Sequence, residues 1–309
     1  MLYKLWEGSW DDDAVIFDRE HRRYADPAKV RYINHKGENF QVEGPHLCEP
    51  SRQRTPLLYQ ATGSPRGVQF AGRHAEVVFT GGRTTEAFKA NVAEIRAAAV
   101  AEGRTGNDVK FVAQAGVIVG RNDLEVADKL DAYRSNASIE GRLVHSRSAI
   151  DYLAYPPEEK LSAIIARKDP GWDEIPASFT PDQTVGEVLA GIANQREGRF
   201  FVAGTPSVVA DEIEKWLDED DLDGINLRQY HTFDTARDFI ELVVPELRRR
   251  GRYRDSYDDG ETLRERVFGP GLARLPQTHR AARYRGGANL ESDNGQEQDA
   301  DEVTSTRVA

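Results

Sequence analysis

The stretch Thr55-Pro-Leu-Leu-Tyr-Gln-Ala-Thr-Gly-Ser-Pro-Arg-Gly67 decides how the chain folds. Residues 56–61 are a short apolar run typical of a buried strand, and residues 65–74 have the pattern of a helix with proline at its first position. Gly63 lets the backbone approach a ligand closely, and Ser64 is suited to cap the helix and to donate a hydroxyl. Free N–H groups at a helix start attract an anion, typically a phosphate. An ordinary Ser-Pro helix cap explains the same residues, because the stretch is neither a Walker loop nor a complete GxGxxG motif.

Strand-like and helix-like segments alternate from this stretch onward. The expected strands are residues 56–61, 76–81, 109–119, 199–204 and 224–228, and the expected helices are residues 65–74, 85–102, 123–134, 185–195, a helix that Thr205 caps, and 235–250. This alternation indicates an α/β fold with a parallel sheet. A (β/α)8 barrel has eight such units in typically about 250 residues. Only about four or five units are visible here, so the sequence predicts roughly half of such a barrel.

The segments on either side of the alternating part are different in character. Leu2, Leu5 and Trp6 have the spacing of the last turns of an amphipathic helix, with no capping residue before them. The polar residues that follow predict a long excursion with a small hairpin. We therefore expect three parts: 1–55 as a helix end plus excursion, 56–285 as the barrel part, and 286–309 as an acidic disordered tail.

Composition excludes several classes of function. The chain has 309 residues and a formal net charge of -11, which argues against nucleic acid and against an anionic membrane surface as partners. Cys48 is the only cysteine, so no internal disulfide forms and no zinc cluster of cysteine ligands exists. No run approaches the roughly 18 apolar residues of a membrane helix, and the start is unlike a signal peptide. These features predict a cytoplasmic protein.

Few residues have the spacing of a catalytic or metal site. The seven histidines form no HxxxH or HExxH pair, so we predict no metal. There is no GxSxG motif, and Cys48 lies in a proline-rich loop without a nearby base. His231 follows the strand 224–228 at the edge where a barrel binds ligands, but a surface histidine is the simpler interpretation. We expect His74, at a helix end, to interact with the helix dipole, and the acidic run 218–223 to be a solvated turn.

Longer motifs resemble a known family. They are Tyr3-Lys-Leu-Trp-Glu-Gly-Ser-Trp, Ala25-Asp-Pro-Ala-Lys-Val, His35-Lys-Gly-Glu-Asn-Phe, Gly44-Pro-His-Leu-Cys-Glu-Pro-Ser-Arg-Gln-Arg-Thr-Pro, Gly204-Thr-Pro-Ser-Val-Val-Ala-Asp-Glu-Ile, Asp223-Gly-Ile-Asn-Leu, Val243-Val-Pro-Glu-Leu-Arg-Arg-Arg-Gly and Thr262-Leu-Arg-Glu-Arg-Val-Phe-Gly. In this order they resemble the nitrilotriacetate and xenobiotic-compound (dibenzothiophene-sulfone type) FMN-dependent monooxygenases of the bacterial-luciferase-like superfamily. The match runs from Leu2 to about Arg285.

The resemblance implies a luciferase-like (β/α)8 barrel and the chemistry of a two-component flavin system. Reduced FMN would come from a separate flavin reductase, and FMN with molecular oxygen would oxygenate a small organic substrate. In such systems the flavin carries the difficult chemistry while the protein positions it and excludes water. The resemblance also implies a homodimer.

The opening stretch matches the family's phosphate loop with two changes. The family loop usually reads Ala-Gly-Ser-Ser-Pro-Arg-Gly, and its serines hold the FMN phosphate. Here Ser64 matches the second serine, Gly63 replaces the first, and Thr62 replaces the glycine. The resemblance therefore implies that Ser64 and Gly63 bind the cofactor, with one hydroxyl lost or moved to Thr62.

The family carries several strands, and most of its flavin and substrate residues, before the helix that ends here at Tyr3-Lys-Leu-Trp. We therefore expect an N-terminally truncated chain, the C-terminal half of the barrel without its first strands, and assign no catalytic residue. Two hypotheses remain open. The chain is the large component of an FMN-dependent monooxygenase, or it is a non-catalytic relic or partner subunit that needs a complementary half-barrel. The sequence does not identify the substrate.

Overall fold

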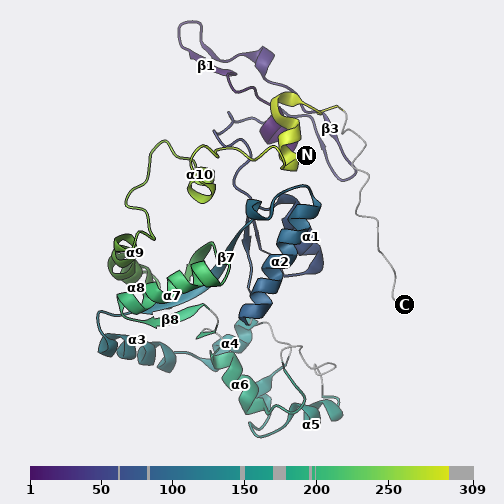
Figure 1. Cartoon of the computed structure of the whole chain (residues 1–309). Helices are drawn as coiled ribbons and strands as arrows, with labels where there is room; N and C mark the ends of the chain where they lie inside the picture. The colour runs from purple at the N-terminus through teal and green to yellow at the C-terminus, as the bar shows by residue number, and fades with distance from the viewer. Residues whose placement is uncertain are drawn as a thin grey trace. The chain divides into compact units, whose positions relative to one another are not determined.

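The computed structural model describes residues 1–61, 63–81, 84–146, 150–169, 179–194, 197–198 and 200–291. Two compact units make up the chain (Figure 1). The first comprises Met1–Phe79, Val92–Lys110 and Ser256–Ala309, and the second comprises Thr80–Asn91 and Phe111–Asp255. Each unit therefore contains segments that are distant in sequence.

The first unit contains the strand, loop and helix expected from residues 56–74. Strand β5 (Tyr59–Ala61) pairs in parallel with β6 (Val77–Phe79), and α1 (Pro65–His74) connects them. The parallel pairing confirms a βαβ unit. Helix α2 (Thr85–Ala101) packs closely on α1, since a Cβ added at Gly72 would lie 2.6 Å from the Cβ of Ala98.

The excursion before β5 contains two hairpins. Strand β1 (Val15–Asp18) pairs with β2 (Arg23–Ala25), and β3 (His35–Lys36) pairs with β4 (Gln41–Val42), both antiparallel. The predicted small hairpin corresponds to β3 and β4. Before them the chain forms a π-helical turn, Lys4–Gly8, where the sequence predicted the end of an amphipathic helix.

The C-terminal part of the first unit contains a short helix and a 3-10 segment. Helix α10 (Leu263–Phe268) begins at a capping box of Thr262 and Glu265, and a 3-10 segment, Arg280–Gly287, follows. Leu290 is buried with Ile33 and Tyr284. Leu290, which the sequence assigned to the tail beginning at residue 286, therefore belongs to this core. Residues 292–309 of that expectation lie outside the described residues.

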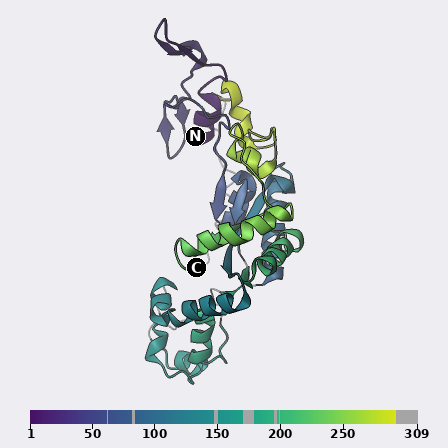
Figure 2. The same cartoon turned by 90° about the vertical axis from the view of Figure 1, so that its left-hand side faces the viewer.

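The second unit is built on a parallel arrangement of three strands. Strand β7 (Lys110–Val119) pairs with β8 (Phe201–Gly204) and with β9 (Gly224–Arg228), each in parallel. Helices α3 (Asp123–Ser135) and α7 (Pro206–Glu219) both lie beside β8 (Figures 1 and 2). The ring of Phe200 meets Phe88 at 5.2 Å and Trp216 at 5.6 Å, both edge to face. These aromatic contacts form part of the core of the unit.

Two helices form within residues 139–180, where many proline and aspartate residues predict less regular structure. They are α4 (Ile139–Ser146) and α5 (Leu161–Ala166). Together with α6 (Val185–Asn194), the helix expected at residues 185–195, they enclose a core of their own within the second unit. Leu161 and Ile164 are fully buried in it. Part of the stretch expected to be irregular, residues 147–149 and 170–178, lies outside the described residues.

The long helix expected at residues 235–250 is interrupted by a wider turn. It consists of α8 (Asp234–Asp238), a π-helical turn (Phe239–Val243) and α9 (Val244–Arg249). Pro245 stands in the first turn of α9. Proline lacks an N–H and clashes with the preceding turn of a regular helix, so the chain accommodates it by a local change of helix type.

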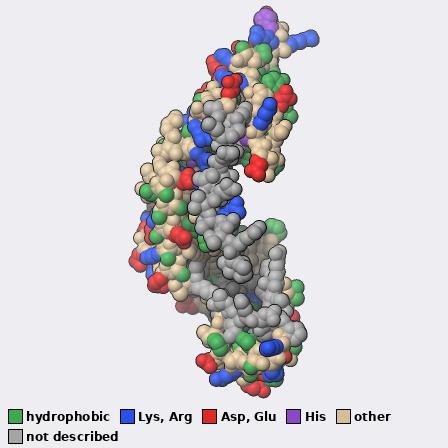
Figure 3. Space-filling view, turned by 90° about the vertical axis from the view of Figure 1, so that its right-hand side faces the viewer, with side chains coloured by type: hydrophobic (Ala, Val, Ile, Leu, Met, Phe, Trp, Pro, Cys, Tyr) green, Lys and Arg blue, Asp and Glu red, His purple; other side chains and the backbone are tan. Residues whose placement is uncertain are grey.

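Charged side chains of both signs are interspersed over the face drawn in Figure 3. Among the described helices, none has the length and apolar character needed to cross a bilayer.

Candidate functional site

The loop between β5 and α1 lies at the carboxyl end of a parallel strand. Ser64 has extended backbone geometry (φ -103°, ψ 155°), and its Oγ accepts a hydrogen bond of 3.1 Å from the Gly67 N–H. Its carbonyl accepts from Val68 N at 2.9 Å. Ser64 is thus the N-cap of α1, as the sequence predicted. Thr62, the position to which one hydroxyl was expected to have moved, lies outside the described residues.

The loop has both room and donors for a phosphate group. A Cβ added at Gly63 would meet no atom within 4 Å, and Gly63, Ser64 and Arg66 are all exposed. Within the described residues, no hydrogen bond is recorded for the Arg66 backbone N–H. A helix start with an open donor and space before it is the arrangement that binds anions. The residues present therefore fit the phosphate of a flavin mononucleotide.

Two other helix starts follow strands of the second unit. The side chain of Asn122 caps α3 by accepting from Glu125 N at 3.0 Å. Thr205 occupies the N-cap position of α7, but its hydroxyl makes no capping hydrogen bond, so the predicted side-chain cap is absent. Gly204 is required for close packing, because an added Cβ would lie 2.6 Å from Cγ1 of Val208.

The two histidines singled out in the sequence have different environments. His231 is exposed, with its Nδ1 2.6 Å from a carboxylate oxygen of Asp234. His74 is the last residue of α1, where burial, assisted by the positive charges of Arg280 and other cations, lowers its pKa to about 3. A neutral imidazole has no charge to offer the helix dipole, so the expectation of a dipole partner at His74 was wrong.

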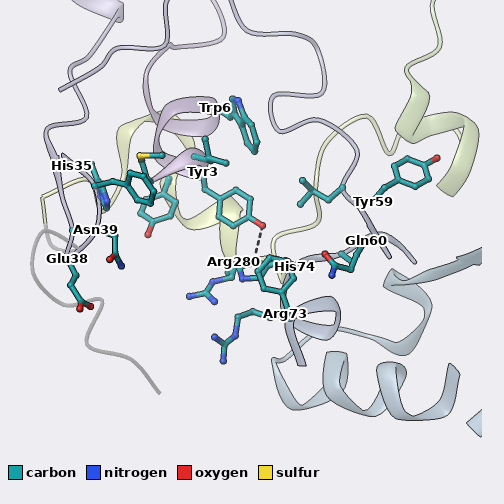
Figure 4. Close-up of a pocket in the computed structure, with 18 residues that line it drawn as sticks. Tyr3, Trp6, His35, Glu38, Asn39, Tyr59, Gln60, Arg73, His74 and Arg280 are labelled. Atoms are coloured by element: carbon teal, nitrogen blue, oxygen red, sulfur yellow. Dashed lines mark hydrogen bonds between the residues drawn. The ribbon is translucent and has the colours of Figure 1, made fainter. Parts of the chain in front are cut away.

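The first unit also contains a pocket of about 530 Å³ (Figure 4). Its walls include Tyr3, Trp6, Tyr59, Phe70, His74 and Arg280. The hydroxyl of Tyr3 is 2.9 Å from Nδ1 of His74. The rings of Phe70 and His74 are 4.6 Å apart, and those of Tyr3 and Trp6 are 6.3 Å apart. Aromatic rings and polar side chains therefore both line the pocket.

The side chains of Tyr3, His74 and His279 are uncharged at neutral pH. Burial raises the pKa of Tyr3 to about 12 and lowers the pKa of His279 to about 4. His279 accepts from Ala281 N at Nδ1, so its Nε2 carries the proton and donates to the His74 carbonyl at 3.2 Å. Because these side chains are neutral, the arginines dominate the electrostatics of the pocket.

The pocket and the phosphate loop lie at opposite ends of α1. Ser64 precedes the first of ten helical residues and His74 is the last, a separation of about 15 Å along the helix axis. Barrel enzymes bind their ligands at the carboxyl ends of the strands, where Ser64 lies. The pocket escaped sequence analysis because Tyr3, His74 and Arg280 are far apart in sequence and share no spacing.

A buried ion pair joins several segments of the first unit. Arg264 donates from Nε and Nη2 to the two carboxylate oxygens of Glu76, at 2.6 and 2.9 Å. Glu76 also accepts from the N–H of Leu58, at 3.0 Å. The guanidinium further contacts the carbonyls of Gln53, Ala273, Thr55 and Pro56. Both charges are buried, and their role is structural.

Among the described residues, no group of three or more His, Cys, Asp or Glu side chains is placed to hold a metal ion. The acidic run at 218–223 instead makes local contacts. Asp218 pairs with Arg252, and the carboxylate of Asp223 accepts from Phe111 N at 2.9 Å. These contacts agree with a structural role for the run.

The strand-helix alternation with parallel strand pairing defines an α/β protein, and comparison with known proteins specifies its family. Residues 3–219 match the Luciferase-like monooxygenase family. The chain belongs to that family, which confirms the resemblance found in its motifs.

Three relatives give the extent of the similarity. The long-chain alkane monooxygenase of Geobacillus thermodenitrificans (strain NG80-2) is 45% identical, over 92% of this chain and 61% of the relative. A crystal structure of a long-chain alkane monooxygenase (LadA) matches with a TM-score of 0.77 at 44% identity, over 92% of this chain and 61% of that one. The dimethyl-sulfide monooxygenase of Hyphomicrobium sulfonivorans is 39% identical, over 92% of this chain and 60% of the relative. The structure of a riboflavin lyase with modified FMN and riboflavin matches with a TM-score of 0.74 at 36% identity, over 92% of this chain and 62% of that one. The chain thus spans about 60% of the length of these relatives.

Proposed function

We propose that the chain is part of the large component of a two-component flavin-dependent monooxygenase. It would use reduced FMN and molecular oxygen to oxygenate a small organic compound in the cytoplasm. A separate flavin reductase would be its partner, and the active assembly would be a homodimer. Its family and the monooxygenase names of its relatives support this proposal. The riboflavin lyase solved with modified FMN supports flavin as the cofactor.

The observation that carries the proposal is the open helix start at the β5–α1 loop. Ser64 and Gly63 would hold the FMN phosphate, through the Ser64 hydroxyl and the backbone around Gly63. The exposed Arg66 side chain would add positive charge at the same helix end. Reduced FMN, when bound, supplies the electrons that activate oxygen. The residues of this chain would bind and orient its phosphate.

Titration with FMN tests the loop directly, by flavin fluorescence and calorimetry. Ser64→Ala removes a hydroxyl and should weaken binding by several-fold, whereas Gly63→Ser should strengthen it, because the added side chain meets open space and restores a hydroxyl donor. Ser138→Ala is the matched control, since Ser138 Oγ also accepts from a backbone N–H, that of Gly141, at 3.0 Å. Equal effects of Ser64→Ala and Ser138→Ala on FMN affinity would show that the loop is not part of the flavin site.

The second candidate function is that of a non-catalytic relic or partner subunit that needs a complementary half-barrel. The observation in favour of this second candidate is that the chain spans about 60% of the length of its relatives. Turnover with a flavin reductase and a panel of small organic compounds distinguishes the two. Product from this chain alone supports the monooxygenase, whereas flavin binding without product, followed by product when the remaining part of a relative is added, supports the partner subunit.

A further inference from the structure

The aromatic pocket contains a guanidinium that the described residues leave unpaired. Arg280 is half-buried in the pocket wall, and in the described part of the chain it has no recorded hydrogen bond or ion pair. Other arginines of the same unit are extensively bonded: Arg264 faces Glu76, and Arg104 donates to the carbonyls of Gly72, Ala75 and Asp108. An unpaired and partly desolvated cation is costly, so Arg280 is suited to pair with something from outside the chain.

The charges around the pocket are predominantly positive. Figure 4 draws Arg73, His74 and Arg280 close together beside Tyr3. The pKa of His74 is lowered first by burial and then by the positive charge of Arg280, with smaller effects of Arg73 and Arg104. Arg73 is offset by Glu102, at 2.9 Å, and Glu38 is an exposed acid of the lining. The interior near His74 therefore favours an anion over a cation.

The walls of the pocket favour an apolar body. Phe70, Phe40 and Tyr59 line it while 52%, 62% and 48% exposed. Rings that remain this exposed around a concave site provide apolar surface for a ligand to bury. His74 adds a polar group: where the Tyr3 hydroxyl donates to Nδ1, the neutral ring carries its proton on Nε2 as a further donor.

We propose that this pocket binds a small carboxylate with an apolar, preferably aromatic, body, whose carboxylate pairs with Arg280 while its body lies against Phe70, Tyr59 and Trp6. A single planar guanidinium matches the two oxygens of a carboxylate. A volume of about 530 Å³ accommodates a ligand of this size. The pocket is a second ligand site, because it lies at the other end of α1 from Ser64, and it does not depend on the proposed flavin chemistry.

Fluorine NMR with 4-(trifluoromethyl)benzoate, together with quenching of tryptophan fluorescence, tests the proposal on the full chain. The benzoate should bind saturably, and the neutral 4-(trifluoromethyl)benzamide should bind about tenfold more weakly or worse, because it lacks the charge-assisted hydrogen bonds. Arg280→Met should weaken benzoate binding by a similar factor and leave benzamide binding unchanged. Arg280→Lys should keep part of the affinity.

Arg283→Met is the matched control. Arg283 belongs to the same 3-10 segment and stacks on Tyr284, 4.8 Å from the ring centroid, but does not line the pocket. It should leave benzoate binding intact. Hydrogen exchange of the 3-10 segment should show that all variants keep the fold. The proposal is overturned if the wild-type chain shows no saturable binding, if benzamide binds as tightly as benzoate, or if Arg283→Met weakens binding as much as Arg280→Met.

Discussion

Removal of the buried guanidinium of Arg264 should destabilise the first unit more than any surface change. Arg264 and Glu76 are 1% and 3% exposed, and two hydrogen bonds join them. Substitution by methionine leaves the Glu76 carboxylate buried without its counter-charge, which costs about 3–5 kcal/mol. Four backbone carbonyls also lose a donor. We therefore expect a loss near the upper end of this range, a large share of the typical ~5–15 kcal/mol stability of a domain.

Urea denaturation followed by tryptophan fluorescence, with hydrogen exchange of residues 53–58 as the local readout, measures the effect of Arg264→Met. Arg266→Met is the control on the same helix, because Arg266 makes a more exposed ion pair with Glu261 at 3.3 Å and should cost less than about 1 kcal/mol. The double variant Arg264→Met/Glu76→Gln should lose less than the sum of the two single losses, since no unpaired charge then remains buried.

Two results would refute this reasoning. The first is equal stability of Arg264→Met and Arg266→Met, which would show that burial adds nothing to the value of the pair. The second is strict additivity in the double variant, which would show that the two side chains contribute independently.

Two further predictions concern the same unit and its neighbour. His74 and His279 have pKa values lowered to about 3 and 4 by burial, so stability should be constant above about pH 6.5, the pKa of a free histidine, and should fall as pH drops below it, because only the unfolded chain then takes up those protons. Replacing both by asparagine should flatten the urea midpoint between pH 6.5 and 5, and an unchanged slope would contradict the assignment. Gly72→Ala should lower the free energy of unfolding by about 1–3 kcal/mol, because its methyl group would overlap Ala98. Gly191→Ala, at an open position on α6, should raise it by about 0.5–1 kcal/mol. Thermal unfolding compares the two variants, and a change of the same sign in both would be inconsistent with the packing.

Elements with strong local signals were predicted well from the sequence. Ser64 followed by proline marks the start of α1, and the helix ends at His74 as expected. The strand expected at residues 224–228 is β9. By contrast, α5 is a short helix in a segment rich in proline and aspartate, and its formation depends on burial of Leu161 and Ile164 rather than on a local pattern. Tertiary packing decided the structure there, and single-sequence patterns do not report it.

The candidate phosphate site was also readable from the sequence, because its parts are consecutive residues. The pocket at the other end of α1 was not. Its polar groups, Tyr3, His74 and Arg280, come from three segments that only the folded chain brings together. The sequence also led to a wrong expectation for the charge of His74. Its position at a helix end can be predicted from the sequence, but its burial against Tyr3 and Phe70 depends on the folded chain.

Helix α1 therefore connects the two proposed sites, which differ in chemistry, within one unit. Its first turn presents backbone donors to solvent beside Ser64, and its last turn places a neutral His74 among aromatic rings and arginines. The close contact at Gly72 fixes the helix against α2 between these two ends. Because this contact lies in the last turns of the ten-residue helix, a ligand at either end acts on the same packed element. Measuring FMN affinity with and without the benzoate probe would show whether the two sites are coupled, since any coupling must appear equally in both affinities.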